Sequence, residues 1–171
     1  MSETEPSAES SDAKQCVFQM QIVVGALCSG VFTFFIVSTF MPAAKPPMPT
    51  PVLTFVALGL AVMAFVTRAV LTSILDKAAF KRAAQLPAEQ RLGQLLVAYR
   101  TRTILGAAML EGAAFFSLIA WMLERQSYSI LTAGVLLSAL IAGMPTRAKL
   151  NTWLAAADRA ANPAAEKAVN W

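Results

Sequence analysis

Residues 102–123 read RTILGAAMLEGAAFFSLIAWML, and Glu111 is the only charged side chain in this stretch after Arg102. A helix needs about 20 mainly apolar residues to cross a hydrocarbon core of roughly 30 Å. The stretch therefore predicts a transmembrane helix, and this assigns the chain to the membrane proteins.

Similar apolar runs occur elsewhere in the chain, at residues 16–41, 52–75 and 128–144. The 171 residues are 57% hydrophobic and only 14% charged, which is far from the usual balance of a soluble domain of this size. We therefore predict an all-α, polytopic membrane protein with four transmembrane helices.

The segments between these runs have distinct compositions. We expect a disordered polar head, a proline-rich outer loop, a cytoplasmic helical linker and an amphipathic cytoplasmic tail, at residues 1–14, 42–51, 76–101 and 145–171. The linker and the tail each repeat apolar residues at helical spacing. Each of these helices could prolong a span or lie against the membrane surface, a neighbouring helix or a partner.

The basic residues indicate the orientation. Of the 14 Lys and Arg residues, all except Lys45, Arg68 and Arg125 belong to the head, the linker or the tail, or flank them. Positive charge is retained in the cytoplasm, so both termini are expected there, in a plasma or inner membrane. Because these residues lie beside apolar runs, we expect the lipid bilayer as a partner and no nucleic acid.

The chain also resembles itself. VVGAL at 23–27 aligns with ILGAA at 104–108, an offset of 81 (104 − 23), and Phe34-Phe35 aligns with Phe115-Phe116 at the same offset. TRAVL at 67–71 aligns with TRAKL at 146–150, an offset of 79 (146 − 67). Compositional bias of alanine-rich helices is the alternative. We favour two duplicated parallel helical hairpins, with repeat units at about 20–89 and 101–166.

Glu111 is the strongest candidate for a functional residue. It lies nine positions beyond Arg102, about 13 Å along a crossing of roughly 30 Å, where a charged side chain is costly. It could bind an ion or relay protons, or it could be a neutral acid that hydrogen-bonds across the bundle. Its counterpart in the first repeat is Gly30.

Arg68 and Arg147 are the other candidates. Arg68 lies near the cytoplasmic end of its run, and Arg147 lies just beyond the fourth run. Long arginine side chains at such positions reach the membrane boundary, so we expect both to be interface anchors. The alternative for Arg68 is an ion pair with Glu111.

The sequence contains few of the residues and motifs that enzyme active sites use. The chain contains no histidine, its eight glycines form no phosphate-binding loop, and its two cysteines, Cys16 and Cys28, suggest no disulfide framework. We predict that the protein is not an enzyme, has no metal site and needs no cofactor.

Residues 100–123 resemble the ion-binding helix of the rotor-ring c subunits of rotary ATP synthases. In that family a polar cytoplasmic loop precedes a helix with a mid-membrane Glu or Asp, and 86–89 (LPAE), Arg102 and Glu111 are similar in kind. The resemblance implies an ion-binding role for Glu111. The family's glycine-rich inner helix has no match here, since residues 52–75 contain only Gly59.

Two functions are therefore expected. The first is a structural, interaction or accessory subunit of the membrane, as a homo-oligomer or in a larger membrane complex. The alternative is a proton- or ion-translocating subunit that uses Glu111.

Overall fold

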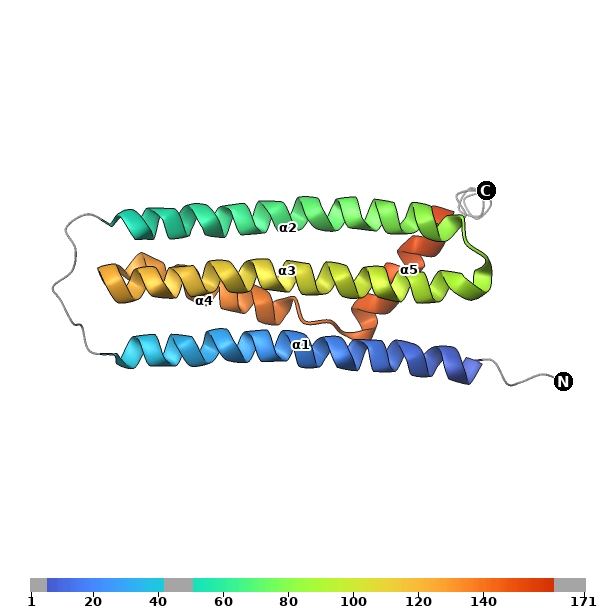
Figure 1. Ribbon diagram of the computed structural model, residues 1–171, viewed down its shortest axis with the longest axis horizontal. Helices are drawn as coiled ribbons and strands as arrows, with labels where there is room; N and C mark the ends of the chain where they lie inside the picture. Colours follow the sequence, from blue (N-terminus) through green and yellow to red (C-terminus); the bar gives the residue numbers. More distant parts are fainter. Residues whose placement is uncertain (1–5, 42–50, 162–171) are drawn as a thin grey trace, which may run out of the picture. The chain divides into compact units, whose positions relative to one another are not determined.

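The structure is a computed structural model that describes residues 6–41 and 51–161, and all its regular elements there are helices. Figure 1 shows them as α1 to α5. Their bounds are Pro6–Phe40, Val52–Ala84, Ala88–Glu124, Ser127–Ala142 and Arg147–Ala161. The proline-rich loop, except Pro51, and the end of the tail lie outside the described residues.

The helices extend well beyond the apolar runs. α1 begins at Pro6, so it includes much of the segment predicted to be a disordered head. The predicted linker consists of the end of α2, a short turn at 85–87 and the start of α3. Alanine, glutamate, lysine and leucine favour helix, so the helices continue until Pro87 interrupts them.

Three helices, α1, α2 and α3, are long and apolar enough to cross a membrane. α4 and α5 meet the same test only as one bent pair, with a 69° angle between them. α4 alone has 16 residues, or about 24 Å, and the break contains Pro145, which cannot donate a backbone hydrogen bond. The structure thus has three candidate spans, or four if the bent pair is counted.

The chain divides into two compact units, which are described separately. Unit 2 consists of Ile22–Val70 and Ile104–Met144. Its core combines small residues of α2 and α3 with larger side chains of α1, α3 and α4, including Val24, Val31, Leu110, Leu118 and Leu136. Alanines such as Ala61, Ala64 and Ala114 let these helices approach closely.

Unit 1 consists of Met1–Gln21, Leu71–Thr103 and Pro145–Trp171. Its core joins α1, α2, α3 and α5, and α5 contributes Leu150, Trp153 and Ala157, all of which are buried. The apolar face of the predicted amphipathic tail therefore packs against neighbouring helices of its own chain. The rings of Phe80 and Tyr99 contact Trp153, with centroids 5.2 and 5.3 Å away.

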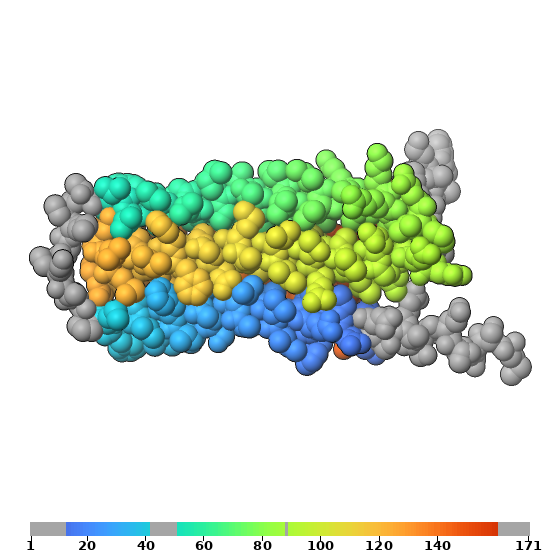
Figure 2. Space-filling model, in the orientation of Figure 1, coloured from blue at the N-terminus to red at the C-terminus, as the bar shows by residue number. Residues whose placement is uncertain are grey.

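Unit 2 exposes large apolar side chains. Phe32, Phe55 and Val62 are more than half exposed, as are Leu131 and Val135 on α4. In the most apolar stretches of α1 and α2 only 22% of the residues are buried, against 44% in α3. α3 is thus the most enclosed of these helices, while α1 and α2 present apolar surface; Figure 2 shows these three on one face.

Candidate functional site

Glu111 lies on the part of α3 that contacts α1. The side chain is partly buried, and its Oε1 would be 3.9 Å from a Cβ atom built on Gly30 of α1. The same virtual atom would be 3.7 Å from the ring of Phe115. None of the hydrogen bonds or ion pairs found among the described residues involves Glu111.

Arg68 turns towards two glycines. Its Nε would be 3.4 Å from a Cβ atom on Gly106 of α3, and its Nη2 would be 2.9 Å from one on Gly143. Gly143 is the C-cap of α4, where backbone carbonyls lack partners within the helix and carry partial negative charge. The guanidinium therefore lies beside a helix C-terminus that favours a cation, and a side chain at Gly143 would crowd it.

The three predicted site residues have different surroundings. Glu111 faces α1, Arg68 lies between α3 and the end of α4, and Arg147 is an exposed residue at the start of α5 in the other unit. An ion pair joins Arg102 to Asp76 in unit 1. An ion pair of Arg68 with Glu111 stays a prediction, as do the roles of all three.

A second carboxylate, Glu124, was not singled out from the sequence. It is 1% exposed, and it accepts hydrogen bonds from the backbone N–H groups of Leu53 and Thr54, at 2.6 and 2.8 Å. The Thr54 hydroxyl donates to it at 2.7 Å, so Ser129 is the donor in the 2.8 Å contact between the two hydroxyls. Glu124 thereby caps the N-terminus of α2, where Pro51 has no side chain that could do so.

Next to Glu124 the chain turns between α3 and α4. Arg125 has a φ of 54°, a left-handed conformation that often ends helices but favours glycine. Its guanidinium lies 5.4 Å from the ring centroid of Trp121 and donates to the carbonyl of Met41 at 2.7 Å. The turn is therefore tied to the end of α1.

A polar cluster in unit 1 stabilises the position of α5 in that unit. Oδ1 of Asp76 on α2 accepts a 2.9 Å hydrogen bond from the indole N–H of Trp153 and forms a 3.2 Å ion pair with Arg102. In the same unit, Gln21 donates to the carbonyl of Pro145, at the break before α5. These contacts join α2 to α5 and to α3, and α1 to the segment before α5, and they indicate a structural role.

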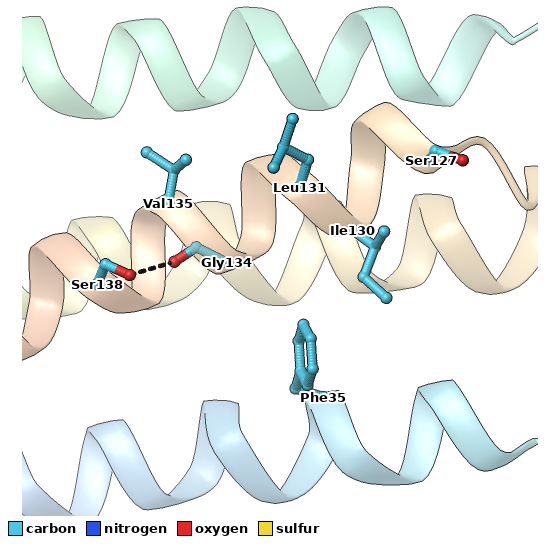
Figure 3. Close-up of a pocket in the computed structure, with 7 residues that line it drawn as sticks. All are labelled: Phe35, Ser127, Ile130, Leu131, Gly134, Val135 and Ser138. Carbon is cyan, nitrogen blue, oxygen red and sulfur yellow. Dashed lines mark hydrogen bonds between the residues drawn. The ribbon is translucent and has the colours of Figure 1, made fainter.

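An apolar hollow lies between α1 and α4 in unit 2. Figure 3 shows its lining, which consists of Phe35, Ser127, Ile130, Leu131, Gly134, Val135 and Ser138. The Ser138 hydroxyl donates to the carbonyl of Gly134 at 2.8 Å within α4. The hollow therefore lacks the converging polar groups that orient a small-molecule ligand.

Within the described ranges 6–41 and 51–161, no three His, Cys, Asp or Glu residues come together in a group that could hold a metal ion.

No protein-family model, curated protein or solved structure matches the chain. The resemblance to rotor-ring c subunits is therefore still a prediction from residues 100–123.

Proposed function

We propose that the protein is an integral membrane protein with a structural or interaction role, as an accessory subunit or an oligomer. The observation that carries the proposal is the apolar surface of unit 2. Its helical segments at 22–40, 52–70 and 104–124 measure about 28–32 Å at 1.5 Å per residue, close to the roughly 30 Å of a hydrocarbon core. A chain that exposes this surface needs lipid or another apolar partner around it.

The distribution of charge supports cytoplasmic placement of unit 1. The charged side chains among the described residues of unit 2 are Arg68, Glu111, Glu124 and Arg125. Unit 1, in contrast, exposes a series of basic residues: Lys14, Lys77, Lys81, Arg82, Arg100, Arg147, Lys149 and Arg159. The positive-inside rule then favours four spans, with α4 as the short fourth span and both termini in the cytoplasm.

Contacts between α1 and α3 support the two duplicated parallel hairpins. The rings of Phe34 and Phe115, which the alignment makes equivalent, have centroids 5.4 Å apart. Gly30 and Glu111, another equivalent pair, also face each other. In a parallel pair of helices related by a twofold axis, equivalent residues meet at that axis. Two such pairs, four residues apart, agree with an axis between α1 and α3.

Purification of the native protein in a mild detergent tests the interaction role. The expected result is a particle larger than one chain, which contains either several copies or defined partner chains. A single chain in its detergent micelle, at the concentration found in the membrane, would refute the proposal.

One observation favours the alternative function, ion translocation. Glu111 is a partly buried carboxylate in a segment of spanning length, and no internal ion pair or hydrogen bond is found for it among the described residues. Such carboxylates in membranes are often ion sites. Glu124, on the same helix, is enclosed and accepts several hydrogen bonds, so it is the matched structural carboxylate.

The two carboxylates give this alternative a sharp test. If Glu111 binds ions reversibly, a hydrophobic carbodiimide modifies it in a pH- or sodium-dependent manner, and Glu111→Gln abolishes ion flux into vesicles. Glu124 should not react. Unmodified Glu111, together with unchanged flux in Glu111→Gln, would eliminate the translocation function.

A further inference from the structure

On its face of α3, Glu111 has two small neighbours, Ala108 and Gly112, and one large neighbour, Phe115. Ala108, Glu111, Gly112 and Phe115 follow the i, i+3, i+4, i+7 spacing of one helix face, and Ala108 and Gly112 are exposed. A Cβ atom on Gly112 would meet nothing within 4 Å. On the side of Ala108 and Gly112, the carboxylate thus has short side chains and open space beside it.

The facing part of α1 is small as well. Gly30 and Ala26 are exposed, and a Cβ atom built on Gly30 would stand 3.9 Å from Oε1 of Glu111. In Figure 2 the side chains of α1 (blue) and α3 (yellow) meet along the face shown. Small residues on both helices leave room for the backbone of a third helix to come close.

A carboxylate in the hydrocarbon region of a membrane needs a group that compensates its negative charge. An ionised acid in the hydrocarbon region costs at least about 2.5 kcal/mol unless a proton, a cation or donors neutralise it. The backbone of α1 opposite Glu111 is helical, so its N–H groups are already used within the helix. Compensation from a neighbouring helix must therefore come from a side chain, and the structure provides none from the residues it describes.

We propose that this face of α1 and α3 binds a transmembrane helix of a partner protein that carries a lysine or arginine near its middle, and that Glu111 pairs with that cation. The inference rests on the proposed interaction role. Charge complementarity favours this occupant over a second copy of the chain. Arg68, a cation of unit 2, is directed towards Gly106 and Gly143.

Synthetic peptides of defined sequence test the pairing. One transmembrane peptide of about 20 leucine and alanine residues carries a single central lysine, and its matched control carries methionine there. The full chain, labelled with a fluorescent donor at its C-terminus, is reconstituted in phosphatidylcholine vesicles with each acceptor-labelled peptide. Energy transfer then gives the two association constants.

We expect the lysine peptide to bind about tenfold more tightly than the methionine peptide, since polar contacts between membrane helices contribute on the order of 1–2 kcal/mol. Glu111→Gln should remove this preference, and Gly30→Ala, whose methyl group would stand against Oε1, should reduce it several-fold. Glu89→Gln, which replaces an exposed carboxylate near the start of the same helix, should keep it. Circular dichroism checks that each variant is folded.

Equal binding of the two peptides, or a preference that survives Glu111→Gln, would overturn the inference. Failure of the proposed function has a different signature, because it would appear as a single chain in the native purification whatever the peptides do. In a native complex that does form, an unchanged particle in Glu111→Gln would likewise contradict the pairing while leaving the interaction role intact.

Discussion

Replacement of Glu124 by glutamine should lower the stability of unit 2 strongly. Two oxygens of this carboxylate accept three hydrogen bonds from the first turn of α2, and the side chain is 1% exposed. Glutamine keeps one acceptor and turns an amide N–H₂ towards a backbone donor. Loss of charge-assisted bonds, with one buried donor left unmatched, should cost about 2–4 kcal/mol. For a chain of this size that corresponds to a fall in Tm of about 5–15 °C.

Thermal unfolding in mild detergent, followed by circular dichroism, measures this change. Glu111→Gln is the matched control on the same helix, and it should shift Tm by no more than about 3 °C because it removes no hydrogen bond found in the structure. Thr54→Val tests the mechanism: combined with Glu124→Gln it should cost less than the sum of the two single changes. Equal shifts for the two glutamine variants, or strict additivity with Thr54→Val, would refute the capping role of Glu124.

Other predictions concern the remaining polar contacts and the orientation. Gly143→Ala should displace the guanidinium of Arg68 and lower stability by about 1 kcal/mol, and in an Arg68→Met background the loss should be smaller, because only the contacts with the carbonyls of Ala139 and Leu140 remain. Trp153→Phe should keep the ring packing but lose the bond to Asp76, costing about 1–2 kcal/mol and making α5 more sensitive to limited proteolysis; unchanged cleavage would contradict this. In a chain without Cys16 and Cys28, Lys14→Cys should react with an impermeant maleimide in inverted vesicles but not in intact cells. Labelling in intact cells would reverse the predicted topology.

The helical class could be predicted because its signals are local. Each apolar run is long enough to indicate a helix. The proline-rich segment and Pro87 mark positions at which a helix is interrupted. The ends of the helices were harder to predict, since polarity says little about helix termination. The polar residues after Pro6, which were expected to be disordered, are helical because they include good helix formers, whereas a helical linker at 76–101 had been predicted from apolar residues at helical spacing.

The packing of the tail shows a different limit. The periodicity of Leu150, Trp153 and Ala157 predicted an apolar helix face, and this face is buried in the structure. Periodicity does not identify the surface that covers such a face. A membrane surface, a partner protein and a neighbouring helix can each bury the same apolar pattern. The choice depends on Asp76 and Tyr99, which are distant in sequence and come close only in the folded chain.

Two of the glutamates of α3, Glu111 and Glu124, show why one site could be found from the sequence and the other could not. Glu111 is conspicuous because its sequence neighbours are apolar, whereas Glu124 follows a span, where a charged residue is ordinary. What makes Glu124 important is the first turn of α2, about 70 residues earlier, whose N–H groups have no partners within their own helix. Glu111 faces the middle of α1, where every N–H group is used by the helix itself. A helix start offers free N–H groups to a carboxylate and a helix interior does not, so in the membrane setting that we propose, compensation for Glu111 would come from a proton, an ion or another chain.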